Sequence, residues 1–135
     1  MSMFKIFDVS GSAASAQTQR LNVVASNVAN ADTVAGPDGK SFKALHVVFQ
    51  SVPMGEATST GVQVSNVIES QKEGRPVYIP GHPAADARGY VTFSNVNPIE
   101  EMVDMISASR SYQNNVEVMN TAKSLLLKTL QMGQS

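Results

Sequence analysis

The sequence predicts a mainly α protein with a small β insert, in which long N- and C-terminal helices pair as a coiled coil. Apolar residues recur at helical spacing at both ends of the chain, and between the ends the period shortens and turn residues multiply. We therefore expect three parts: an N-terminal helix in residues 1–33, a middle segment of short antiparallel strands and loops in 34–96, and a C-terminal helix in 97–135.

The N-terminal segment carries one narrow apolar seam. Its members recur every seven residues, which is the repeat of a single position in a coiled coil. They are Phe7, Ala14, Leu21 and Val28. The rest of the segment is Ser, Ala, Gln, Thr and Asn with few charges. A freely solvated helix usually carries opposite charges at i and i+4. We therefore expect this helix to be surrounded by protein.

The middle segment contains four short runs rich in β-branched residues, within 41–50, 60–70, 75–79 and 89–93. Gly, Pro, Asn or Ser bounds each run, which is typical of a small antiparallel β region. Residues 53–61 and 80–89 read as loops between strands. Pro76 and Pro80 lack backbone donors, so the strand between them is expected at a sheet edge.

The C-terminal segment has the strongest pattern in the chain. Asn97 can cap a helix that has Pro98 at its first position and Glu100 three residues after the cap. Spacings of three and four then alternate, as at positions a and d of a coiled coil. The predicted seam consists of Met102, Met105, Tyr112, Val116, Met119, Leu126 and Leu130, with Ser109 and Lys123 in the same register. Such a helix is about 50 Å long, more than a compact domain of this size normally holds.

Composition excludes several classes of function. The chain has 135 residues, 16% charged residues, a net charge of −1 and no cysteine. Scattered basic residues give no electrostatic footprint for nucleic acid or an anionic membrane, and no stretch approaches a membrane span. The start lacks an apolar region of secretory length. We expect no direct membrane insertion, and either a cytosolic protein or one exported without a cleaved signal peptide.

Three features resemble chemical sites and are better explained locally. The run GPDGKS ends like a phosphate-binding loop, but Val34 replaces the required first glycine and a helix precedes the run where a strand should. His46 and His82 have no carboxylate at zinc-ligand spacing. Asp86 and Arg88 near His82 are expected to form a polar turn. We predict no catalytic residues, no cofactor and no metal.

The stretch VVASNVANADT, residues 23–33, places two asparagines at the end of a helical run. Three explanations are open for Asn27 and Asn30. They form part of a ligand site, or they end an ordinary helix in which Asn30 adopts a left-handed conformation, or they lie on a surface that contacts another protein.

The stretch ASNVANADT resembles the N-terminal signature of the bacterial flagellar axial proteins, the rod, hook and hook-associated family. The run SASRSYQNNVEVMNTAKSLLLKTLQMGQ resembles their C-terminal helix, and together these segments cover about half the chain. The middle, with NADTVAGPDGKSFKALHVVFQ and PGHPAADARGYV, resembles the proximal-rod type, which makes the match nearly full length. Thr33 is followed by VAGPDG where many axial proteins have Pro-Gly, which argues against hook protein. Asn115 stands where relatives often have alanine.

The resemblance implies a structural subunit of the basal-body rod, a hollow helical drive shaft that transmits torque through the periplasm. It implies hetero- and homo-oligomeric helical assembly with other rod subunits, an adaptor at the membrane ring, and export by the flagellar type III apparatus. Asn27, Asn30 and Thr33 match the family's assembly motif position by position and are expected to fix the exit from the inner helix and to hydrogen-bond across subunits. The alternatives are a soluble coiled-coil adaptor or type III secreted effector, and, more remotely, a small hydrolase or metal enzyme using the loop around His82.

Overall fold

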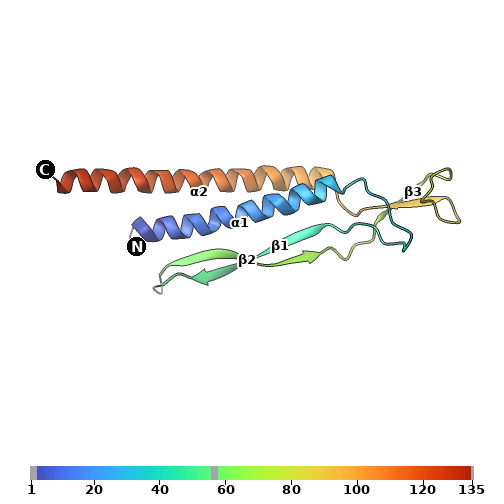
Figure 1. Cartoon of the computed structure of the whole chain (residues 1–135), viewed down its shortest axis with the longest axis horizontal. Coiled ribbons are helices and arrows are strands. Elements are labelled where there is room, and N and C mark those ends of the chain that lie inside the picture. The colour runs from blue at the N-terminus through green and yellow to red at the C-terminus, as the bar shows by residue number, and fades with distance from the viewer. Residues whose placement is uncertain (1–2, 56–57, 135) are drawn as a thin grey trace.

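The computed structural model describes residues 3–55 and 58–134 as an elongated molecule (Figure 1). Its elements are α1 (Met3–Ala29), β1 (Leu45–Pro53), β2 (Thr60–Glu69), β3 (Arg75–Tyr78), β4 (Tyr90–Phe93) and α2 (Pro98–Gly133). The two long helices run antiparallel side by side, and two antiparallel hairpins form the middle of the chain. The predicted fold class is confirmed.

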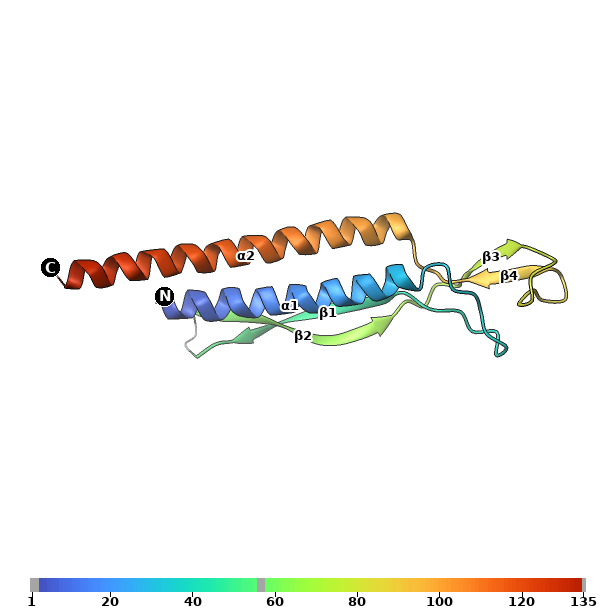
Figure 2. The ribbon, with the colours of Figure 1, turned by 45° about the horizontal axis from the view of Figure 1, so that its top comes forward.

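Helix α1 is the middle layer of the molecule. Figure 2 shows α2 on one side of it and the β1–β2 hairpin on the other. Its buried side chains are mostly small and lie on more than one face: Ser10, Ala14, Ala16, Val24 and Asn27. Small side chains let two neighbours approach one helix closely, which explains why α1 is covered on two sides.

Helix α2 begins where the sequence predicts. Asn97 has extended backbone and accepts a hydrogen bond from the backbone N–H of Ile99 at 3.1 Å, and Pro98 occupies the first turn. At about 1.5 Å of rise per residue, its 36 residues span about 54 Å. It continues past the N-terminal end of α1 (Figure 1). In the described part of the chain, no helix is long and apolar enough to cross a membrane.

The β1–β2 hairpin packs along α1. Its register pairs Val47 with Val67, and a bulge lies between Val48 and Phe49. A Cβ on Gly61 would come within 2.9 Å of Oγ of Ser12 on α1, so this position needs a glycine for close approach. The Ser12 hydroxyl accepts a hydrogen bond from the backbone N–H of Val62 at 3.1 Å, which ties the start of β2 to α1.

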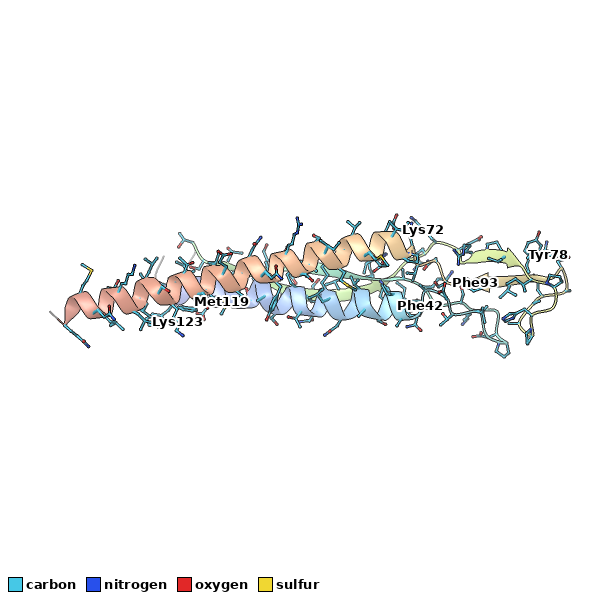
Figure 3. The ribbon with its side chains drawn as sticks, turned by 90° about the horizontal axis from the view of Figure 1, so that it is seen from above. Phe42, Lys72, Tyr78, Phe93, Met119 and Lys123 are labelled. Atoms are coloured by element: carbon cyan, nitrogen blue, oxygen red, sulfur yellow. The ribbon has the colours of Figure 1, made fainter. Side chains whose placement is uncertain are left out.

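The β3–β4 hairpin projects beyond the helices. Figure 3 shows Phe42 and Phe93 near the base of this distal part and Tyr78 at its tip. Tyr78 packs edge to face on Tyr90 with ring centroids 5.3 Å apart. Because the sheet has only two strands, Pro76 lies on an edge strand, as predicted.

Candidate functional site

Asn27 lies at the point where α1, β1 and α2 meet. Its side chain is 1% exposed. Nδ2 donates to the backbone carbonyl of Leu45 at 2.8 Å and to Oε2 of Glu101 at 3.1 Å, and Oδ1 accepts from the backbone N–H of Leu45 at 2.9 Å. One amide therefore fixes the first residue of β1 and the first turns of α2 to the end of α1.

Asn30 and Thr33 close the C-terminal end of α1. The Asn30 backbone N–H and its Nδ2 both donate to the carbonyl of Ser26, at 3.1 and 2.8 Å. The Thr33 hydroxyl donates to the Asn30 carbonyl at 2.7 Å. Among the described residues only glycines have positive φ, so the alternative with Asn30 in a left-handed conformation is wrong. Side-chain hydrogen bonds occupy the terminal carbonyls in its place.

A small apolar cluster lies beside Asn27. It consists of Ala31, Ala44 and Val96, with Phe42 packed against it. The returning chain is held there by two polar residues. Ser94 Oγ donates to the Ala31 carbonyl at 2.6 Å, and Asn95 Oδ1 accepts from the Ala44 N–H at 2.6 Å. The entry to β1 and the entry to α2 are thus both bonded to the same junction.

Two acidic side chains of α2 are bonded to side chains of α1 near the junction. The Glu101 carboxylate is 4% exposed and accepts the hydrogen bond from Asn27. Arg20 Nη2 on α1 lies 3.0 Å from Oδ1 of Asp104 on α2. Because both side chains of this ion pair are partly exposed, it contributes about 0.2 to 1 kcal/mol. The pair fixes helix register more than it stabilises the fold.

Only part of the predicted seam lies against α1 within the single chain. On α1, Ala14 is buried and Phe7, Leu21 and Val28 are half-buried. On α2, Met105, Val116, Met119 and Leu126 are half-buried, whereas Met102, Tyr112 and Leu130 are exposed. The most covered row lies one position earlier and has a seven-residue period: Glu101, Ala108, Asn115 and Ala122. The seam stays a prediction for the assembled state.

Sequence reasoning missed Glu101 as the partner of Asn27 and Ala108 and Ala122 as the buried centre of α2. The signal was present, because these residues recur at multiples of seven. It was missed because the seam was predicted from the positions of the larger Met and Leu side chains. A row of alanines indicates close helix approach as clearly as a row of leucines indicates burial.

The runs that resemble chemical sites are turns. In GPDGKS, the Gly39 N–H donates to the Gly36 carbonyl at 2.9 Å and Gly39 has φ 74°. His82 Nδ1 accepts from the Ala84 N–H at 3.0 Å. Within the described residues, no group of three or more His, Asp or Glu side chains is placed to hold a metal ion.

Asp86 organises the distal loop. Its Oδ1 accepts from the backbone N–H groups of Tyr90 at 3.0 Å and Arg88 at 2.8 Å. These hydrogen bonds, that of Tyr90 first, hold the pKa of Asp86 below its ordinary value. The expected polar turn is present at this position.

Both ends of the chain match families of flagellar proteins. Residues 7–37, which contain the Asn27 motif, match the flagella basal body rod protein family, and residues 87–132 match the C-terminal family of the flagellar basal body rod FlgEFG proteins. The two matched segments contain α2 almost entirely and most of α1. Both terminal segments therefore have the sequence of flagellar basal-body rod proteins.

Curated relatives match over nearly the whole chain. Flagellar basal-body rod protein FlgC of Escherichia coli O6:H1 is 58% identical over 134 residues, which is 99% of this chain and 100% of the relative. FlgC of Salmonella typhimurium is 57% identical and FlgC of Buchnera aphidicola from Acyrthosiphon pisum is 44% identical, each with the same coverage. The chain belongs to the FlgC family of flagellar basal-body rod proteins. It is a structural subunit of the rod, located in the flagellar basal body, where it assembles with other axial proteins.

Proposed function

We propose that the chain forms part of the proximal rod, a hollow helical drive shaft that transmits torque through the periplasm. Residues 1–33 and 97–135 form its coiled-coil domain, and residues 34–96 face outward. The role is mechanical and requires no catalytic residue, cofactor or metal. Export by the flagellar type III apparatus, contact with other rod subunits and contact with an adaptor at the membrane ring belong to the same proposal.

The observation that carries this proposal is the uneven covering of α2. Large apolar side chains are 56 to 73% exposed over its first turns, on a chain whose junction polar groups are already bonded internally. Monomeric proteins rarely expose such a stripe, and proteins that associate do. A surface of this kind fits a subunit that is completed by neighbours.

The assembly motif acts through geometry in this proposal. Asn27 uses its amide within the chain, so its contribution to assembly is to preset how α1, β1 and α2 leave the junction. Asn30 and Thr33 end α1 at a defined residue. A subunit whose junction is rigid presents its outer surfaces to neighbours in one arrangement, which a repeating helical assembly requires.

The proposal is tested by deleting the gene and isolating basal bodies from the complemented strain. The expected result is loss of rod and swimming on deletion, and recovery of the chain in purified basal bodies at the level of the rod nearest the membrane ring. A chain that is essential for assembly but absent from purified basal bodies would be an export adaptor. A chain recovered outside the cell, with swimming unaffected by the deletion, would be a secreted effector.

A further inference from the structure

The β1–β2 hairpin starts at two neighbouring residues whose backbone groups point to opposite edges of the strand. Both backbone groups of Leu45 face the outer edge, where the Asn27 amide binds them. The Ala44 carbonyl faces the inner edge and accepts from the Ser70 N–H across the hairpin at 2.8 Å. In an antiparallel pair the N–H and C=O of one residue face the same edge. The Ala44 N–H therefore also lies on the inner edge of the hairpin.

A second side-chain amide closes that inner edge. Asn95 lies in the segment between β4 and α2 and is half-buried. Its Oδ1 accepts from the Ala44 N–H at 2.6 Å, and its Nδ2 donates to the Lys72 carbonyl at 2.9 Å. Because Lys72 comes soon after the end of β2, the Asn95 side chain joins the chain that enters the hairpin to the chain that leaves it. A carboxylate could not donate to Lys72, so this pair of bonds suits an amide.

Packing along the hairpin fixes its direction less firmly than these bonds do. The hairpin runs along α1 (Figure 2), but a cleft of about 350 Å³ separates part of β1 from the helices. Val23 of α1, Phe49 of β1 and Asp104 of α2 are among the residues that line this cleft. Toward the tip, the Ser12 hydroxyl accepts from the Val62 N–H. A two-stranded hairpin has little core of its own, so its contacts at the base and near the tip determine where it points.

We infer that Asn95 is a positioning residue of the rod subunit, which fixes with Asn27 the direction in which the β1–β2 hairpin leaves the helices. The two amides hold opposite edges of Ala44 and Leu45. An amide on one edge alone leaves the strand able to rotate about that contact, whereas amides on both edges hold it from two sides. The inference rests on the proposed helical assembly, in which every subunit must present its hairpin in the same direction.

The first test reads the two amides separately, by hydrogen exchange of the full-length chain followed by NMR. Asn95→Ala removes the acceptor of the Ala44 N–H, so exchange at Ala44 is expected to quicken at least about fivefold. The neighbouring Leu45 N–H keeps its acceptor on Asn27 and is expected to stay protected. Asn95→Asp keeps an acceptor at the same place and is expected to restore protection of Ala44. A general loss of structure would affect both amides alike.

The second test measures the direction of the hairpin. The chain has no cysteine, so Gln50→Cys on β1 and Gln113→Cys on α2, both at exposed positions, accept one spin label each. Electron paramagnetic resonance is expected to give a narrow distance distribution with Asn95 and a broader one with Asn95→Ala. Asn66→Ala is the matched control, because the Asn66 side chain bonds to the next N–H within β2, and it is expected to leave the distribution unchanged.

The same variants are compared in cells, where Asn95→Ala is expected to lower both incorporation into basal bodies and swimming, and Asn66→Ala to lower neither. Circular dichroism reports folding, and if Asn95→Ala loses helix content, Asn95→Leu, which keeps more of the side-chain volume, replaces it.

Two results overturn the inference. Native exchange at Ala44 or an unchanged distance distribution in Asn95→Ala shows that Asn27 and the contacts with α1 suffice to direct the hairpin. A broadened distribution with normal incorporation and swimming shows that assembly does not depend on that direction. Absence of the native chain from purified basal bodies would instead overturn the proposed function, and the exchange and distance results would still decide whether Asn95 positions the hairpin.

Discussion

Helix α1 and helix α2 are packed together but differ in how completely the chain covers them. α1 lies between α2 and the β1–β2 hairpin, and its buried residues include Ala14, Ala16, Val24 and Asn27. Among the described residues, α2 packs on one other element, α1, and its buried residues are Glu101, Ala108 and Ala122. Large apolar side chains, among them Ile99 and Val103, are exposed on the less covered helix.

This difference shows that burial in the single chain does not follow side-chain hydrophobicity. Small residues on α1, such as Ala14 and Ala16, permit two close neighbours, so the helix is covered on two sides. On α2, large residues of the first turns such as Ile99, Val103 and Ile106 are exposed, whereas Met105, Val116 and Met119 are half-buried. In the single chain, α1 therefore has covered surfaces on two sides and α2 on one.

The largest expected effect comes from Asn27, the residue at which the covered helix meets both neighbours. Asn27→Ala removes three hydrogen bonds and leaves the Leu45 backbone groups and the Glu101 carboxylate buried without their partner. We expect the free energy of unfolding to fall by about 3 to 5 kcal/mol, measured by urea denaturation.

Asn30→Ala is the matched control for that change. It removes one hydrogen bond, to a carbonyl that the Asn30 backbone N–H also occupies, so the expected loss is about 1 kcal/mol. Equal losses for the two variants would show that the junction does not depend on the Asn27 amide.

A second, smaller effect separates the two sides of α2. Val116 is half-buried and lies mid-helix, so Val116→Asp cannot escape by fraying an end and is expected to cost about 2 to 4 kcal/mol. Glu117→Ala, on an exposed neighbouring position, is expected to change stability by no more than about 0.5 kcal/mol. In cells we expect Val116→Asp to be exported but absent from the rod, and Glu117→Ala to assemble and support swimming. The same outcome for both would mean that the covered side of α2 is assigned wrongly.

Amide exchange in dilute chain sharpens the comparison between the helices. Residues 14–27 of α1, covered on two sides, are expected to exchange at least about tenfold more slowly than residues 123–133 of α2, which are exposed apart from the half-buried Leu126. Mass spectrometry of peptic fragments measures both segments in one experiment. Protection of residues 123–133 equal to that of α1 in a monodisperse monomer would contradict the view that neighbours complete α2.

The smallest effect is expected in the distal loop, which neither helix covers. The pKa of Asp86 is lowered in the folded chain, so its carboxylate stabilises the fold above the ordinary pKa of an aspartate, about 4. That stabilisation is lost as pH falls through the lowered value. The difference in unfolding midpoint between native chain and Asp86→Asn should therefore be present at neutral pH and vanish in acid. A difference that grows in acid would reverse the assigned sign.

The sequence by itself determined the local structure. The cap at Asn97, Pro98 at the first position of α2 and the absence of glycine and proline until Gly133 specify a long helix, because capping and propensity act within a few residues. The four β-branched runs specify strands for the same reason, and residues 41–50 and 60–70 contain most of β1 and β2. The terminal motifs were also sufficient to suggest the flagellar axial family, because each of them is one continuous stretch of the sequence.

Only the tertiary structure decided which side of each helix is covered and what Asn27 does. Glu101 lies 74 residues from Asn27 and Leu45 lies 18 residues from it, and nothing local links the three. The covered row of α2 fell on Ala108 and Ala122 and left Met102 exposed, because the closest approach of two helices is set by the smallest side chains between them. Periodicity identifies an apolar face, but the position of the neighbouring helix determines which part of that face the single chain buries.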